Sequence, residues 1–301
     1  MIRLRAQNGF SLLELILVVV LLGVLASGAG LLITRPIEAY NDQLRRQHLV
    51  DQGEMALRQI ARDLRRALPN SVRVGGSGSA LEMVNSVAGA RYRDEIGGSS
   101  FVSTNDWLDF SIADNSFNLL GPLVGTFTGN ERLVIYNTAH TNFYRDVTAG
   151  SNPGIVTPTL TTFTLSTAAA TFAGEYDEPR ISLSQPFQFS QRSPGQRIFL
   201  IDGPISYICN TGARTMTRYD NYAYQNDTSQ PVVDTSFNPS NTGFGSVQSG
   251  RVLTQLSACN FTYSPGVSQR GSIVTIQITI DDQPSGESIS LYHQVHVLNV
   301  P

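Results

Sequence analysis

The sequence predicts an α+β protein in which one long N-terminal helix packs on an antiparallel, β-rich globular head. Three observations lead to this fold class. Residues 15–33 form an apolar run without a charged residue. Helical spacing of apolar residues then continues as far as Leu68. Beyond Val74 the pattern changes to short runs of alternating polar and apolar residues, which are typical of strands.

The N-terminal segment places a single carboxylate, Glu14, at the start of the apolar run. The run exceeds the length of about 18 residues that indicates a membrane-spanning helix. A charged side chain there costs roughly 2.5 kcal/mol or more of insertion free energy, so it is expected to have a function and a partner. The first nine residues contain Arg3 and Arg5 but no acid, which predicts a cytoplasmic N-terminus and an exported chain after Thr34.

The residues around Gly9 and Phe10 resemble the processing signal of type IV pilins and of the pseudopilins of type II secretion. That signal is a short basic leader followed by Gly, Phe, Ser or Thr, Leu, a hydrophobic residue and Glu, and residues 9–14 read Gly-Phe-Ser-Leu-Leu-Glu. The resemblance implies cleavage between Gly9 and Phe10 by a prepilin peptidase, and N-methylation of the new Phe10 amine. It also implies that Glu14 pairs with a neighbouring subunit's amine during assembly.

Two other interpretations fit this segment less well. A secretory signal peptide has an apolar core of about 7–15 residues before its cleavage site, shorter than the run found here. An ordinary membrane anchor explains the length of the run, but it explains neither Glu14 nor the junction between Gly9 and Phe10.

The second half of the helix, beyond Pro36, is expected to have one apolar face. Leu57, Ile60, Leu64 and Leu68 recur at helical spacing, while arginines occupy the other faces. A proline at position 69 is expected to end the helix at Leu68. The Gly- and Ser-rich residues 75–79 then predict a flexible connection to the head.

Six strands are the clearest in the head, at residues 107–112, 132–136, 197–201, 205–209, 272–280 and 288–298. The segment 210–250 is long and polar. Because a structureless loop of that length is unusual, we expect a hairpin within it around residues 214–224.

Cys209 and Cys259 are the two cysteines of the chain. They do not form a CxxC pair, and two thiols alone make a poor zinc site. In an extracytoplasmic compartment they are expected to form a disulfide, which would close a loop of about 51 residues and stabilise the fold by roughly 4 kcal/mol. The alternative is two buried free thiols that behave as small hydrophobic side chains.

Charge and residue content exclude several function classes. Residues 35–73 carry eight Arg and five acids, whereas residues 74–301 carry eleven Arg and eighteen acids, so the head is not expected to bind nucleic acid. All 21 basic residues are Arg, and the absence of Lys excludes a P-loop, a Schiff base and a Ser-Lys dyad. No nucleophile elbow, dinucleotide-binding glycine turn or HExxH helix occurs. We therefore expect neither an enzyme nor a cofactor.

Two groups of side chains could suggest a metal site, and each also has an ordinary structural explanation. His293 and His296 occupy an odd and an even position of a predicted strand, so they point to opposite faces and are not expected to share an ion. The Asp and Asn residues at positions 220–227 offer oxygen ligands for calcium but lack the spacing of an EF-hand loop. No metal site is predicted.

Three further segments resemble a narrower group of proteins. Residues 55–74 resemble both the minor pseudopilins of the J type and the biogenesis proteins of the mannose-sensitive haemagglutinin (MSHA) pilus, and residues 201–209 and 293–301 resemble the latter. By this resemblance the chain is a minor pilin-like subunit of an MSHA-type pilus, processed by a prepilin peptidase and acting near the fibre's tip or in its initiation.

The resemblance implies a leader at residues 1–9, a transmembrane half of the helix at 10–34, a periplasmic half at 35–70 and a β-rich head at 71–301. The expected location is the inner membrane, crossed once, with the head in the periplasm and a later place in the extracellular pilus. Expected partners are other minor and major pilin-like subunits, the prepilin peptidase and the inner-membrane assembly platform.

Two alternative functions stay open. The first is a J-type minor pseudopilin of a type II secretion system. The second is an adhesin-like tip subunit that binds a ligand through the loop at residues 210–250.

Overall fold

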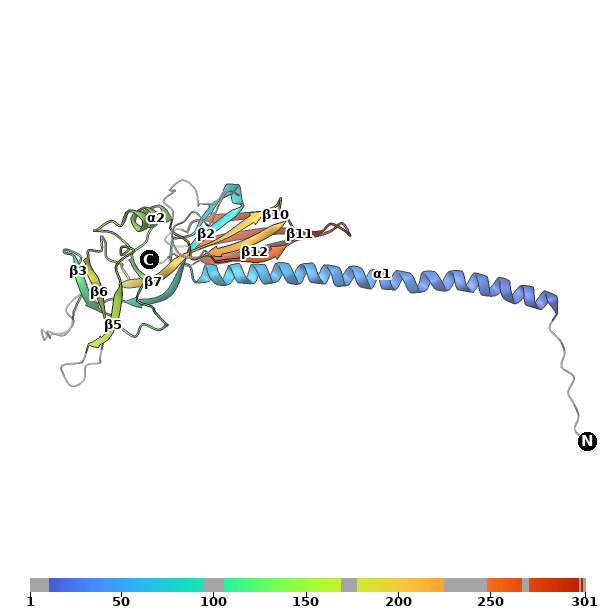
Figure 1. Cartoon of the computed structure of the whole chain (residues 1–301), viewed down its shortest axis with the longest axis horizontal. Coiled ribbons are helices and arrows are strands. Elements are labelled where there is room, and N and C mark those ends of the chain that lie inside the picture. Colours follow the sequence, from blue (N-terminus) through green and yellow to red (C-terminus); the bar gives the residue numbers. More distant parts are fainter. Residues whose placement is uncertain are drawn as a thin grey trace, which may run out of the picture. The chain divides into compact units, whose positions relative to one another are not determined.

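The structure is a computed structural model that describes residues 11–94, 106–168, 178–224, 248–266, 271–297 and 299, and its side-chain description leaves out residues 29–34, 76, 167, 168 and 248. The chain forms two compact units, residues 1–51 and residues 52–301. An N-terminal helix is followed by a head rich in antiparallel strands (Figure 1), which confirms the predicted α+β class.

Helix α1 begins at Leu12 and ends at Arg65, and it continues through Pro36. Residues 52–65 belong to the same compact unit as the strands. The buried residues of this part of the helix include Leu57, Ile60 and Leu64, at the predicted helical spacing, while Arg58 and Arg62 on other faces are exposed. The predicted apolar face is therefore confirmed as part of the head's core.

The helix ends three residues before the predicted end at Leu68, because a strand takes over the backbone pairing. That strand is β2, Ala80–Arg91. The Leu68 N–H donates to the Val84 carbonyl at 2.8 Å, and the Ser86 N–H donates to the Arg66 carbonyl at 2.9 Å. These bonds hold residues 66–68 beside the strand in place of another helical turn.

The centre of the head is a six-stranded antiparallel sheet. Its strands are β1 (Arg73–Gly75), β2, β4 (Arg132–Ile135), β7 (Arg197–Asn210), β8 (Thr215–Asp220) and β9 (Gln248–Thr254). Their order is β1-β2-β7-β8-β9, and β4 also pairs with β7. β7 therefore has β2 along one edge, and β4 followed by β8 along the other.

Two strands predicted at residues 197–201 and 205–209 are one strand, β7. The sequence suggests a break because Gly203 and Pro204 interrupt the apolar pattern. Pairing with β2 nevertheless continues across both residues, with irregularities in β2 around Ser86. Pro204 lies in the interval between the residues paired with β4 and those paired with β8, so its missing N–H removes no ladder bond to either strand.

Two layers pack on the central sheet at β4. One is helix α2 (His140–Ala149), and the other is a three-stranded sheet of β3 (Asp114–Asn118), β6 (Glu178–Phe187) and β5 (Phe163–Ala168). In β4, Leu133 and Ile135 pack in a cluster with Phe117 of β3, whereas Val134 packs in a cluster with Phe143 of α2. Burial on both faces explains why residues 133–135 of β4 are all apolar.

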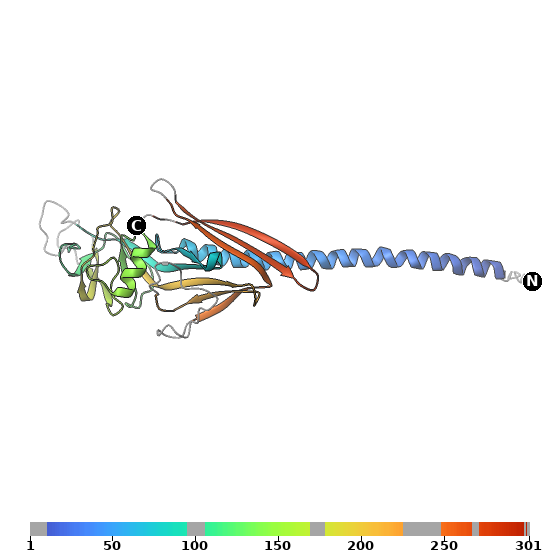
Figure 2. The ribbon, with the colours of Figure 1, turned by 90° about the horizontal axis from the view of Figure 1, so that it is seen from above.

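A third sheet contains β10 (Leu256–Ser264), β11 (Ser272–Asp282) and β12 (Glu287–Val297), shown from above in Figure 2. Alternate residues of β11, from Val274 to Ile280, are buried. A Cβ on Gly53 of α1 would lie 2.2 Å from Leu291 Cδ1 and 2.8 Å from Ile280 Cδ1. This sheet therefore packs closely on the helix at Gly53.

Two local predictions were wrong. Residues 107–112 form no strand, because the Asp109 carboxylate accepts hydrogen bonds from the N–H and Oγ of Ser111 and turns the chain.

The predicted flexible connection at residues 75–79 contains a 3-10 turn, Gly76–Gly78, between β1 and β2. Gly78 has a φ of 97°, and a Cβ there would lie 2.1 Å from Asn260 Oδ1, so this position requires glycine.

Candidate functional site

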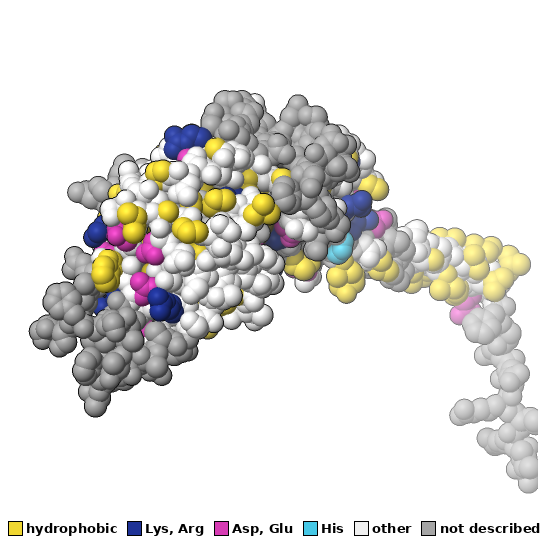
Figure 3. All heavy atoms as spheres, turned by 60° about the vertical axis from the view of Figure 1, so that its left-hand side comes forward, with side chains coloured by type: hydrophobic (Ala, Val, Ile, Leu, Met, Phe, Trp, Pro, Cys, Tyr) yellow, Lys and Arg dark blue, Asp and Glu magenta, His cyan; other side chains and the backbone are white. Residues whose placement is uncertain are grey.

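The first turns of α1 expose apolar side chains on all sides. Twelve large apolar residues between Leu12 and Leu25 are each at least 44% exposed, and Figure 3 shows apolar side chains gathered on this part of the helix. A helix that is apolar all round is normally buried in its functional state. A large exposed apolar surface marks an interaction site. This surface is therefore the candidate assembly site.

Glu14 lies in the first turn of α1, directly after a helix cap. Ser11 precedes the helix, and its Oγ accepts a hydrogen bond from the Glu14 N–H at 3.2 Å. Ser followed three residues later by Glu is the sequence of a capping box. A carboxylate in the first turn also interacts favourably with the helix dipole, by about 0.3–1 kcal/mol. Glu14 thus has a local role in starting the helix, and the Ser-x-x-Glu spacing is the sequence signal of that role.

The predicted cleavage and methylation site, Gly9 and Phe10, lies outside the described residues. Cleavage and methylation there stay predictions. In the part of the chain that the structure describes, no helix is long and apolar enough to cross a membrane.

The predicted disulfide between Cys209 and Cys259 is confirmed, with the two Cα atoms 6.3 Å apart. Cys209 lies in β7 and Cys259 in β10. The bond therefore joins the central sheet to the third sheet across a sequence separation of 50 residues.

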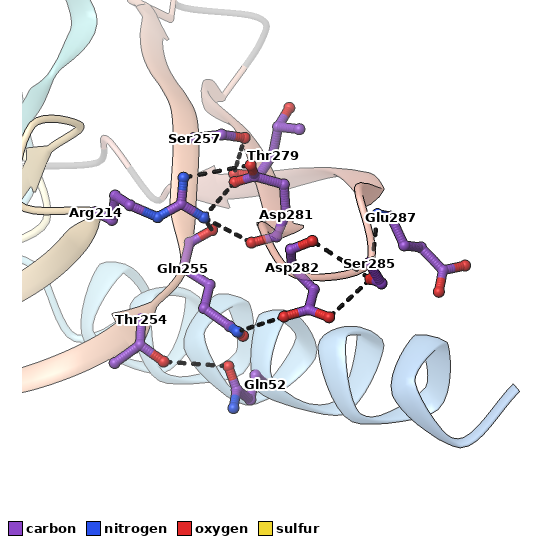
Figure 4. A network of polar contacts seen from close by, with 10 residues as sticks. All are labelled: Gln52, Arg214, Thr254, Gln255, Ser257, Thr279, Asp281, Asp282, Ser285 and Glu287. Atoms are coloured by element: carbon purple, nitrogen blue, oxygen red, sulfur yellow. Dashed lines mark hydrogen bonds and ion pairs between the residues drawn. The ribbon is translucent and has the colours of Figure 1, made fainter. Parts of the chain in front are cut away.

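A polar network joins the same two sheets near the disulfide (Figure 4). Arg214, in the turn between β7 and β8, donates to the Asp281 carboxylate of β11 through Nη2 at 2.6 Å and Nη1 at 3.3 Å. Its Nη2 also donates to the Asp281 carbonyl at 2.6 Å. The hydrogen bond from Arg214 lowers the pKa of Asp281.

The network continues to the β11–β12 turn and to the helix. Gln255 Nε2 donates to Asp282 Oδ1 at 3.3 Å, and Ser285 Oγ donates to Asp282 Oδ2 at 2.7 Å. On the helix, Gln52 Oε1 accepts from Thr254 Oγ1 at 3.4 Å. The hairpin predicted at 214–224 is wrong, because this segment contains one strand, β8, which pairs with β7 and β9 instead of with a second strand of its own.

Asp63 connects the buried face of α1 to the central sheet. Its Oδ2 accepts from the Tyr207 hydroxyl of β7 at 2.7 Å and from Arg218 Nε of β8 at 2.8 Å. Burial, together with the Asp63 hydrogen bond, raises the pKa of Tyr207, so this phenol stays a donor. The sequence offered one signal of this contact, an acid between the apolar positions Ile60 and Leu64.

The candidate metal ligands have ordinary surroundings. His293 is half-buried and His296 is exposed, on opposite faces of β12 as predicted. Asp220 pairs with Arg218, and the later part of the polar run 220–227 lies outside the described residues. Among the described residues, no group of three or more His, Cys, Asp or Glu could hold a metal ion.

Replacing one cysteine tests the disulfide. Cys209→Ser is expected to lower the free energy of unfolding by roughly 4 kcal/mol, because the bond closes a loop of about 51 residues. Urea denaturation measures this loss, and a thiol titration of the unfolded, unreduced wild-type protein should find no free thiol. Two reactive thiols in that titration would contradict the bond.

The pair of Arg214 and Asp281 predicts a pH dependence. Its contribution, about 1 kcal/mol or less, should be present above the ordinary Asp pKa of about 3.9. It should be lost as the pH falls through the lowered pKa of Asp281. The difference in unfolding free energy between wild type and Asp281→Asn should therefore shrink between pH 7 and about pH 2.5. A constant difference over this range would contradict the prediction. Asp282→Asn is the matched control for the loss of a carboxylate at the end of β11, because Asp282 is bonded to Gln255 and Ser285.

Comparisons with known proteins identify one segment of the chain. Residues 4–30 match the family model described as the prokaryotic N-terminal methylation motif. No curated protein and no solved structure matches the chain. The motif covers the predicted processing site and Glu14, and it supports a type IV pilin-like or pseudopilin subunit that interacts with pilin subunits and a prepilin peptidase.

Proposed function

We propose that the chain is a minor pilin-like subunit of an MSHA-type type IV pilus that acts at or near the fibre's tip or in its initiation complex. One observation carries the proposal. The methylation motif at residues 4–30 includes the first turns of α1, and these turns expose apolar side chains on all sides. The choice of pilus rests on the resemblance of residues 55–74, 201–209 and 293–301 to MshO, a biogenesis protein of that pilus.

The helix surface suggests how such a subunit would work. Before assembly, residues 10–34 would lie in the inner membrane, and afterwards they would lie in the core of the fibre. Both surroundings are apolar, so the hydrophobic effect changes little between them, and helix packing and polar pairing decide assembly. Glu14 would be unfavourable in lipid until the Phe10 amine of a neighbouring subunit pairs with it.

The proposed location follows from the same segment. The chain would cross the inner membrane once, with its head in the periplasm and a later place in the extracellular pilus. The disulfide between Cys209 and Cys259 supports an oxidising compartment for the head.

Two alternative functions share the same motif. A J-type pseudopilin of a type II secretion system is supported by residues 55–74, and a pull-down of the full-length protein in detergent would separate it from a pilus subunit by the partners recovered. An adhesin-like tip subunit would use the loop at 210–250, of which residues 225–247 lie outside the described part.

The assembly role of Glu14 is tested by Glu14→Val. The variant should be processed and inserted into the membrane at least as well as wild type, because a carboxylate has been removed from lipid. Its recovery with sheared pili should fall, because the neighbour's amine loses its partner.

Processing at Gly9 is tested separately. Mass spectrometry should find N-methyl-Phe10 at the start of the mature protein, and Gly9→Val should keep the leader and block assembly.

Ser11→Ala separates pairing from helix capping. It removes the cap of the first turn, at a cost of about 1 kcal/mol, and leaves the Glu14 carboxylate in place. Normal assembly of Ser11→Ala together with poor assembly of Glu14→Val would support the pairing. Equal loss in both variants would assign Glu14 to the helix start, and normal assembly of Glu14→Val would contradict an assembly role.

A further inference from the structure

A hollow opens where β7 changes its neighbour along one edge. β4 pairs with β7 as far as Ile201, and β8 begins to pair at Ile205. Within the described chain, residues 202–204 have no paired strand on this edge. A hollow of about 310 Å³ lies here, lined by residues of β4 and α2, by residues 201–203 of β7 and by residues 221–224 that follow β8.

Arg132, the first residue of β4, lines this hollow and is only 6% exposed. Its Nε donates to the Thr157 carbonyl at 2.5 Å, and its Nη1 donates to the Val147 carbonyl at 3.1 Å. Its Nη2 is buried and has no hydrogen-bond partner among the described residues. Burial lowers the pKa of Arg132 to about 10, so the guanidinium is still charged at neutral pH.

A second buried arginine in the head shows what Arg132 lacks. Arg73 of β1 lies opposite Glu82 of β2, and its Nη2 is 2.8 Å from Glu82 Oε2. Both side chains are almost fully buried, so each charge is neutralised by the other. Arg132 instead donates to two backbone carbonyls, which satisfy hydrogen bonds without supplying a negative charge. An anion bound in the hollow would stabilise a buried cation of this kind.

Tyr224 places a second unused donor in the wall of the same hollow. Its ring centroid is 5.7 Å from Arg132 Cζ, and its hydroxyl is buried without a hydrogen-bond partner among the described residues. Burial raises the pKa of Tyr224, so the phenol stays protonated. Two residues that line the hollow therefore each carry a donor, Arg132 Nη2 and Tyr224 Oη, that has no acceptor among the described residues.

The rest of the lining limits the class of ligand. The exposed lining residues carry amide, hydroxyl and carboxylate groups: Asn130, Thr148, Thr159, Asp202 and Asn221. A carboxylate at this position would repel a doubly charged phosphate but would accept hydrogen bonds from hydroxyl groups. The lining therefore favours a molecule with one carboxylate and several hydroxyls over a phosphate or a purely apolar ligand.

We infer that this hollow binds an acidic sugar, with Arg132 Nη2 and Tyr224 Oη donating to its carboxylate and the exposed polar side chains contacting its hydroxyls. Arginine is well suited to this role, because its planar guanidinium matches the geometry of a carboxylate. The site is independent of the assembly role of α1, so either proposal can fail without the other.

Binding can be measured by calorimetry on the full-length protein in detergent, with glucuronate and N-acetylneuraminate as probes. Glucose serves as the neutral sugar and acetate as the bare carboxylate. Wild type should bind at least one acidic sugar, and both glucose and acetate should bind at least about tenfold more weakly, because a lost hydrogen bond to a charged group costs about 1.5–3 kcal/mol.

Two variants assign the binding to the hollow. Arg132→Gln and Tyr224→Phe should each weaken binding of the acidic sugar by about tenfold or more. Arg251→Gln, which changes an exposed arginine of β9 outside the lining, should bind like wild type. Tyr224→Phe removes one oxygen atom and so keeps the test valid if Arg132→Gln does not fold.

Three outcomes would overturn the inference. They are no saturable binding of either acidic sugar by wild type, equal binding of glucose or acetate, and unchanged affinity in a folded Arg132→Gln or Tyr224→Phe protein.

Discussion

The head depends on the burial of one face of α1, at residues 52–65. The third sheet comes so close to the helix that Gly53 leaves no room for a side chain beside Leu291. The central sheet reaches the same helix through Asp63, which accepts from Tyr207 and Arg218. The disulfide and the Arg214–Asp281 pair then join the two sheets to each other. Residues 52–65 of the helix and the two sheets therefore share one core, and each part is packed against the others.

The same helix places two different demands on its sequence. Residues 52–65 need apolar side chains on one face and polar side chains, here arginines, on the others, because the head buries only one face. The turns from Leu12 to Leu25 expose apolar side chains on all sides, as an interaction surface does. Glu14 is the exception in those turns, and its place after the Ser11 cap gives it both a local role and a proposed role between subunits.

The sequence predicted those parts of the fold that local patterns determine. The helix periodicity, the strands β4, β11 and β12, and the disulfide pairing were all visible in it. The end of α1 and the unity of β7 were not, because both depend on pairing with β2, which is distant in the chain. The strand expected at 107–112 failed because an Asp109 side chain competed with the sheet. The hollow at Arg132 could not be foreseen, since it arises where β4 and β8 share one edge of β7.

The most direct test of this account compares two fragments, residues 52–301 and residues 66–301, by urea denaturation followed by circular dichroism. The first keeps the buried face of α1 and should unfold in a single cooperative transition. The second lacks that face, exposes the apolar side chains of both sheets and should show no cooperative transition; adding a peptide of residues 52–65 should restore it. Equal cooperative unfolding of the two fragments at the same midpoint would contradict the claim that the helix is part of the head's core.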